Sequence, residues 1–225
     1  MSSSAQSSVN LWVSTYPFFE STLLFSFEEK LQAVGPVPVQ ILFFDPDGSL
    51  FNEVQIELDP TRTGLLELEP FMGGCKLEAG LKHAHVEVRS LPGVRTTSRI
   101  HASTGACIMG APCELTSRHS AFFPVLMSAE RSPLMVLVNR SNIEAAIRLR
   151  LYCAKRMPEM QTSVPAHGAR LVSVATDFPE FVPEEGARGV PAYLRISCLN
   201  GAECGVQLLD LAKQDKGQEV FTSVS

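Results

Sequence analysis

The sequence lacks the short motifs that many nucleotide-binding and hydrolytic enzymes carry. Neither Gly-x-Gly-x-x-Gly nor Gly-Lys followed by Ser or Thr occurs, so no familiar phosphate-binding loop is present. Gly-x-Ser-x-Gly is also missing, and the five His residues show no recognisable pairing with a Ser or Cys nucleophile. These absences count against nucleotide-dependent and nucleophilic catalysis, and they favour a non-enzymatic role.

An excess of charge of one sign and long apolar runs are missing as well. The 225 residues include 19 basic and 24 acidic side chains, a net charge of −5, without a basic run that would attract nucleic acid or an anionic membrane. The best candidate for a membrane helix, Leu31 to Phe44, is too short and contains two prolines. The first nineteen residues lack the basic and apolar regions of a signal peptide. We therefore expect a cytoplasmic protein that neither binds nucleic acid nor inserts into a membrane.

Six cysteines, without an export signal, predict reduced thiols, and their even number leaves disulfides as the alternative. The segments Cys107 to Cys113 and Cys198 to Cys204 share the pattern Cys-x-x-Gly-Ala-x-Cys. The five intervening residues exceed the two to four that are usual in zinc sites. We interpret these four cysteines as small buried hydrophobes, with a redox pair or metal site as the alternative.

Alternating apolar and polar residues recur along the chain, which is the pattern of half-buried strands. Val54 to Leu58, Ala84 to Val88 and Ile147 to Leu151 each place apolar side chains at every second position. The intervening segments contain turn residues such as Asp45-Pro-Asp-Gly48, and convincing helical periodicity is absent. Short strands separated by such turns predict an all-β fold with antiparallel sheets.

An internal repeat divides the chain. Val39 to Phe44 aligns with Ile147 to Tyr152, and Ala84 to Val88 aligns with Ala192 to Ile196, both at an offset of about 108 residues. The shared order of strand, turn, Pro, strand, long loop and hairpin supports the alignment. We therefore predict two tandem antiparallel β-sandwich units, residues 10–117 and 118–225, after a disordered tail of residues 1–9.

The order of features in the second unit is characteristic. Val138-Asn139 is followed by a short polar turn, the strand Ala146 to Tyr152, Val164-Pro165-Ala166, and Asp177-Phe178 before an acidic loop. This order resembles the small β-sandwich family of the sensory rhodopsin transducer, and a weaker likeness covers the first unit. The resemblance implies a cytosolic, non-catalytic, oligomeric interaction module. No site motif transfers, so the receptor-binding role of the transducer is not expected here.

A His-rich strand is the candidate metal site. His83, His85 and Glu87 lie two residues apart, and therefore on one face of a predicted strand. If residues 91–94 form a hairpin, His101 on the returning strand lies near His85. Three imidazoles and a carboxylate would suit zinc or another divalent first-row metal. The alternative is a polar, solvated strand face, which is favoured because the aligned second-unit positions hold Pro, Tyr and Arg.

Apolar side chains outside the predicted core mark candidate interfaces. Leu42 and Phe44 lie on the outer strand face of the first unit, and Phe178 and Phe181 lie in the acidic loop of the second. Such surfaces are usually covered by another domain or subunit, so we expect a homo-oligomer, with a dimer favoured. The alternative for the two loop aromatics is that they cap the end of the sandwich.

Together these features predict a non-enzymatic protein-interaction or self-assembling β-sandwich module that needs no cofactor. Two alternatives remain open, because sandwiches host many unrelated activities. One is a divalent-metal-binding protein or metalloenzyme that uses the His cluster. The other is a carbohydrate-binding or surface module, which would require export.

Overall fold

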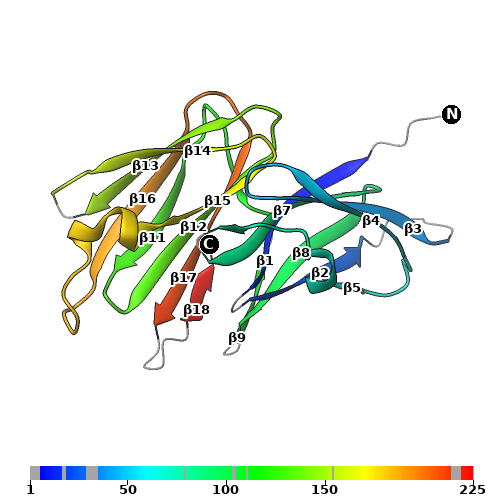
Figure 1. Cartoon of the computed structure of the whole chain (residues 1–225), viewed down its shortest axis with the longest axis horizontal. Helices are drawn as coiled ribbons and strands as arrows, with labels where there is room; N and C mark the ends of the chain where they lie inside the picture. Colours follow the sequence, from blue (N-terminus) through cyan, green and yellow to red (C-terminus); the bar gives the residue numbers. More distant parts are fainter. Residues whose placement is uncertain are drawn as a thin grey trace. The chain divides into compact units, whose positions relative to one another are not determined.

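The computed structural model describes residues 6–16, 19–28, 35–78, 80–102, 105–109, 111–153, 155–213 and 219–224. The chain divides into two compact units, Met1–Ala111 and Pro112–Ser225. Four antiparallel sheets account for the strands drawn in Figure 1, two in each unit. The described segments contain no helix that is long and apolar enough to cross a membrane. The predicted all-β class with antiparallel sheets is confirmed.

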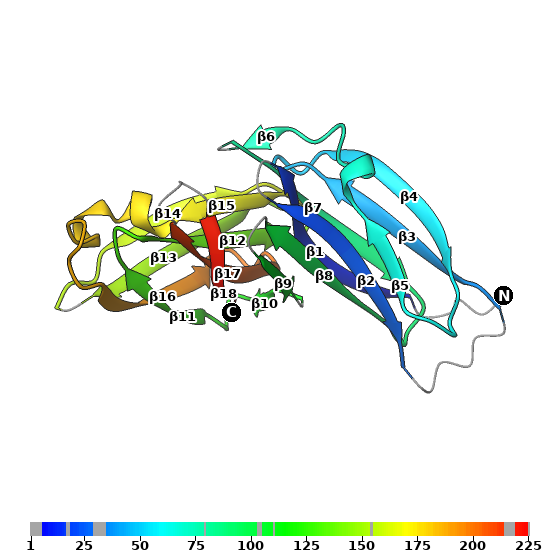
Figure 2. The same ribbon diagram turned by 90° about the horizontal axis from the view of Figure 1, so that it is seen from below.

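The first unit consists of two sheets, both visible in Figure 2. One runs in the order β1 (Ser7–Tyr16), β7 (Leu81–Ser90), β3 (Val37–Phe44) and β4 (Leu50–Leu58), and β6 (Leu77–Glu78) pairs with β7. The other runs in the order β5 (Gly64–Glu67), β2 (Glu20–Phe27), β8 (Val94–Ala102) and β9 (Gly105–Met109). A 3-10 helix, η1 (Glu69–Phe71), follows β5.

The second unit also consists of two sheets. One sheet runs in the order β11 (Ala121–Met127), β16 (Val190–Cys198), β13 (Ala145–Cys153) and β14 (Glu159–Val164). The other runs in the order β10 (Cys113–Leu115), β17 (Cys204–Lys213), β12 (Arg131–Asn139) and β15 (Ala169–Ser173), and β18 (Glu219–Val224) pairs with β17. Two short helices, α1 (Val174–Asp177) and η2 (Pro179–Phe181), connect β15 to β16.

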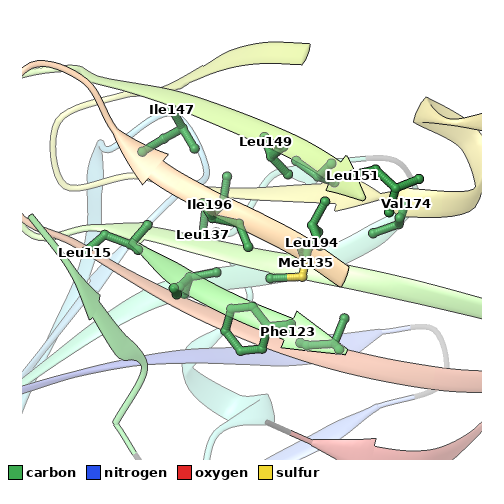
Figure 3. Packing of buried hydrophobic residues seen from close by; sticks show 14 of the residues in the cluster. Leu115, Phe123, Met135, Leu137, Ile147, Leu149, Leu151, Val174, Leu194 and Ile196 are labelled. Atoms are coloured by element: carbon green, nitrogen blue, oxygen red, sulfur yellow. The ribbon is translucent and has the colours of Figure 1, made fainter. Parts of the chain in front are cut away.

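Each unit encloses its own apolar core between its two sheets. In the second unit, side chains of β13 and β16 pack against those of β12, as Figure 3 shows. Every second residue of β13 is buried, as the alternation predicts, and full burial of each Leu or Ile contributes about 1.5–3 kcal/mol. The labelled core residues of these three strands are Met135, Leu137, Ile147, Leu149, Leu151, Leu194 and Ile196.

The strand pairing follows one scheme in both units. The order β1-β7-β3-β4 corresponds to β11-β16-β13-β14, and β5-β2-β8-β9 corresponds to β15-β12-β17-β18. Register agrees as well: Ile41 of β3 lies opposite Val88 of β7, and Leu149 of β13 lies opposite Ile196 of β16. The internal repeat stays a prediction, now based on this shared scheme and on the sequence offset.

Two boundaries differ from the sequence-based prediction. Ser7 to Val9 fall within the predicted tail of residues 1–9, yet they belong to β1 and pair with β7; residues 1–5 lie outside the described part. An edge strand is held by backbone hydrogen bonds, which polar composition does not reveal. The units divide after Ala111 rather than after residue 117, because β10 pairs with β17 of the second unit.

The buried side-chain amide of Asn139 forms hydrogen bonds to the Val-Pro-Ala turn of the second unit. Asn139 is fully buried, and its Nδ2 donates to the carbonyl oxygens of Ile143, Val164 and Pro165 at 2.7, 3.1 and 2.9 Å. Its Oδ1 accepts hydrogen bonds from the backbone N–H and the hydroxyl of Ser141 at 3.0 and 2.6 Å. The side chain therefore joins the turn after β12 to the turn after β14.

Candidate functional site

The first imidazole of the predicted metal cluster is buried and fully hydrogen-bonded. His83 on β7 is 0% exposed. Trp12 Nε1 donates to His83 Nδ1 at 3.1 Å, and His83 Nε2 lies 2.8 Å from Glu78 Oε2. Because Nδ1 accepts a hydrogen bond, Nε2 carries the proton and donates to the carboxylate. The neutral ring therefore has no lone pair left for a metal ion.

The second imidazole is also buried, beside two of the predicted interface residues. His85 is 1% exposed; its Nε2 lies 2.8 Å from Asn10 Oδ1, and its ring stacks on Phe44 with centroids 5.2 Å apart. Phe44 and Leu42 are only 8% and 5% exposed. The interpretation of a solvated His face is therefore wrong for these two His residues. Leu42 and Phe44 are already buried in a single chain, so they offer no apolar surface to a second subunit.

The other two predicted ligands do not join the buried imidazoles. Arg89 donates to both carboxylate oxygens of Glu87 at 2.8 and 2.9 Å, and Ser8 donates to one of them at 3.0 Å. Burial raises the pKa of Glu87, but these hydrogen bonds outweigh it, and the net pKa is lowered. His101 lies on β8, which pairs with β2 and β9, in the sheet that does not contain β7.

The predicted hairpin is therefore wrong, because the chain passes from one layer to the other between β7 and β8. Alternation assigns side chains to a face but does not say which strand is the neighbour. Within the described ranges, no group of three or more His, Cys, Asp or Glu side chains could hold a metal ion.

The aromatic residues of the acidic loop contribute to the core of the second unit. Phe178 is buried in the core cluster, and Phe181 packs against the same cluster. The Arg156 guanidinium lies over the Phe181 ring, 4.7 Å from its centroid. The interpretation that these rings cap the end of the sandwich therefore describes the structure better than an interface role.

The cysteines are free wherever their side chains are described: Cys75, Cys113, Cys153, Cys198 and Cys204. Of the four cysteines predicted to be buried, Cys198 and Cys204 are buried, whereas Cys113 is exposed at the start of the short edge strand β10; Cys75 and Cys153 are buried as well. Burial and the neighbouring Cys198 thiol raise the pKa of Cys204 to about 12, which suits an unreactive core residue. The side chain of Cys107 lies outside the description.

A polar hollow of about 610 Å³ opens on the first unit, beside the ends of β3, β4 and β7. Gln40, Gln55, Glu57 and Arg89 contribute side chains to its lining. The Arg89 guanidinium is already held by two hydrogen bonds to Glu87. The hollow thus holds no uncommitted cation, and it contains none of the predicted metal ligands.

Arginine and aromatic side chains gather on the outer face of the sheet β11-β16-β13-β14. Because alternate residues of these strands fill the core, the remaining ones point outward. Phe122 and Tyr193 are 61% and 60% exposed. We name this surface the Arg–Tyr face and define it by Phe122, Arg148, Arg150, Tyr152, Tyr193 and Arg195.

Strand register arranges these side chains in rows across the sheet. Phe122 lies opposite Arg195, Arg195 opposite Arg150, and Arg150 opposite Glu159. The Arg195 guanidinium lies 5.5 Å from the Phe122 ring centroid, and Arg150 donates twice to one Glu159 oxygen, at 3.0 and 2.6 Å. The next row places Tyr193 opposite Tyr152. Two guanidinium groups therefore occupy directly paired positions on neighbouring strands.

The positive charge of this face acts on its central tyrosine. Hydrogen bonds from Arg150 and Arg195 lower the pKa of Tyr152, and the two positive charges add to the effect. Hydrogen bonding with Arg150 likewise lowers the pKa of Glu159. Three arginines face a single carboxylate here, so the face is positive on a chain whose net charge is −5. Such a surface attracts anionic groups.

The sequence-based list of sites missed the Arg–Tyr face. The signal was present, because Ile147 to Tyr152 alternates core residues with Arg148, Arg150 and Tyr152. What the pattern did not reveal was the partner strand, whose register brings Arg195 opposite Arg150. Only this pairing turns two ordinary amphipathic strands into a concentrated positive surface.

No family model matches the chain, and no curated protein matches it. One similar solved chain belongs to the T13 viral particle of IBDV, with 9% identity over 86% of this chain and a TM-score of 0.19. Another belongs to the Gt strain of infectious bursal disease virus, with 7% identity over 94% and a TM-score of 0.15. This chain spans 54% and 64% of the length of those chains. At such TM-scores the likeness carries no argument, and the resemblance to the transducer family stays a prediction.

Proposed function

We propose that this protein is a non-enzymatic interaction module that binds acidic segments of proteins through its Arg–Tyr face. The placement of Arg150 directly opposite Arg195 carries the proposal. Like charges that face each other across neighbouring strands destabilise a sheet. The Glu159 carboxylate offsets one of these two positive charges, and an anionic partner would relieve the repulsion that remains.

The side-chain chemistry of the face suits a protein partner. Arginine binds carboxylates through two parallel hydrogen bonds, and its planar group also stacks on aromatic rings. Arginine and tyrosine are enriched at protein interfaces and among the few residues whose truncation costs most of the binding energy. Tyr193 and Phe122 add exposed aromatic area beside the guanidinium groups. An extended acidic segment with interspersed aromatic residues would meet both kinds of group.

A soluble copolymer of Glu and Tyr, labelled with a fluorophore, is the probe for this function. We expect the wild-type protein to bind it in 50 mM salt and to bind it at least tenfold more weakly in 500 mM salt, because surface attraction is screened. The double variant R150Q/R195Q should bind at least tenfold more weakly, with unchanged or slightly higher stability. The control R62Q/R95Q removes two exposed charges from the first unit and should bind like the wild type.

Equal binding by R150Q/R195Q and the wild type would overturn the proposal. Tighter binding of a single-stranded oligonucleotide or of heparin than of the copolymer would also overturn it, since the face would then select polyanions rather than protein segments. Binding of a neutral oligosaccharide that survives R150Q/R195Q would favour the carbohydrate alternative instead.

A further inference from the structure

We infer that the acidic segment bound by the Arg–Tyr face is the loop Pro179–Arg188 of a second copy of this chain. This inference rests on the proposed function and identifies the partner. It predicts that copies associate head to tail, through two different surfaces of the second unit.

The charge of the loop complements that of the face. Glu180, Glu184 and Glu185 lie in ten residues that contain a single cation, Arg188. Glu184 and Glu185 are exposed. Among the described side chains, neither forms an ion pair within 4 Å, whereas Glu180 lies 3.9 Å from Arg156. Two carboxylates of the loop are therefore available to the guanidinium groups of another copy.

The loop is also held in one shape, which lowers the entropic cost of binding. Phe178 anchors its start in the core, and the helix η2 follows, with the Val182 N–H donating to the Pro179 carbonyl at 3.1 Å. The Ala187 N–H donates to the Glu184 carbonyl at 3.0 Å, and Gly186 between them adopts a φ of 77° that glycine accepts without strain. The two free carboxylates thus project from a formed turn.

The geometry predicts the symmetry of the assembly. A contact between a face and a loop joins two unlike surfaces, so each copy keeps one free face and one free loop. Such heterologous contacts form rings or open chains of copies. The isologous dimer expected from the sequence would instead place one patch against itself, and here that would bring arginine against arginine.

Charge reversal tests the inference because it breaks the contact and then restores it. The variant R148E/R195E reverses the sign of the face, and E184R/E185R reverses that of the loop. In sedimentation experiments from 1 to 100 μM in 50 mM salt, we expect the weight-average mass of the wild type to rise at least twofold. It should return to that of a single chain in 500 mM salt.

Each double variant alone should remain a single chain, whereas the quadruple variant should regain the concentration-dependent mass. A mixture of the two double variants should also associate, because the reversed face meets the reversed loop. Regained association shows at the same time that both sets of substitutions fold. As matched control, E67R/E69R reverses two acidic residues of the first unit and should associate like the wild type.

A wild-type chain that stays single at 100 μM in 50 mM salt would overturn the inference. If it still binds the Glu–Tyr copolymer through Arg150 and Arg195, the proposed function stands and its partner is another acidic protein. The inference would also be overturned if both double variants still associate. It would equally be overturned if neither the quadruple variant nor the mixture of the two double variants associates.

Discussion

Removal of the buried amide of Asn139 should destabilise the second unit far more than removal of an exposed one. In Asn139→Ala, the carbonyl oxygens of Ile143 and Val164 lose the donor that Asn139 supplies, whereas the Pro165 carbonyl keeps the Gly168 N–H as a donor at 3.0 Å. The Val164 contact is fully buried and the other two are partly buried. An orphaned buried acceptor costs about 1–3 kcal/mol and a partly hydrated one less, so we expect a total of about 3 kcal/mol.

Hydrogen exchange measured by mass spectrometry isolates this effect, because the amides of each unit report on that unit. A loss of about 3 kcal/mol corresponds to roughly 150-fold faster exchange of the most protected amides of β13 and β16. Amides of β3 and β7 in the first unit should be unchanged and serve as the internal control.

Asn200→Ala is the matched comparison. Asn200 also bridges two segments, since its Nδ2 donates to the Glu144 carbonyl at 2.7 Å and its Oδ1 accepts from the Ala146 N–H at 3.1 Å. These two contacts are exposed, and a third, weak one from the Cys198 thiol at 3.5 Å is partly buried. Water replaces the exposed partners, so we expect a cost of about 1 kcal/mol. If the two substitutions accelerate exchange equally, or if Asn139→Ala costs less than about 1 kcal/mol, the reasoning from burial is refuted.

Two further predictions concern titration of single side chains. Hydrogen bonds from Arg150 and Arg195 favour the ionised form of Tyr152, so in the folded protein it should ionise below the ordinary pKa of 10.0. The difference in ultraviolet absorbance between wild type and Tyr152→Phe should show this transition; a transition at or above pH 10 would contradict it. For Cys204 the folded pKa of about 12 exceeds the ordinary value of 9.0. The contribution of its neutral thiol to the free energy of unfolding is therefore fully present below pH 9 and is lost between pH 9 and 12. After correction for intrinsic exchange, we expect the amides of the second unit to exchange faster as the pH rises through that window, and we expect a weaker effect of pH in Cys204→Ala. Identical pH dependence in the wild type and in Cys204→Ala would count against this role of Cys204.

Much of the architecture follows from short-range patterns. The alternation from Val54 to Leu58, from Ala84 to Val88 and from Ile147 to Leu151 correctly predicts strands and the side that faces the core, although on β7 His83 and His85 on the opposite side are buried too. Such patterns are readable because successive side chains of a strand point to opposite faces, whatever the rest of the fold does. The antiparallel all-β class follows from these strands and the turn residues between them.

The functional surfaces depended on which strands become neighbours. His101 was predicted to lie near His85, but β7 and β8 lie in different sheets. The Nδ1 atom of His83 instead accepts a hydrogen bond from Trp12 of β1. Arg150 and Arg195 are 45 positions apart in sequence, and β13 and β16 place them side by side.

By itself, the sequence determined the strands, their inward sides, the absence of familiar catalytic motifs and the acidic net charge. Only the tertiary structure decided that His83 and His85 are buried and that Arg150 and Arg195 form one positive surface. The physical reason is that alternation is a local property of the chain. Register and layer assignment depend instead on long-range pairing, which sets the neighbours of every outward side chain.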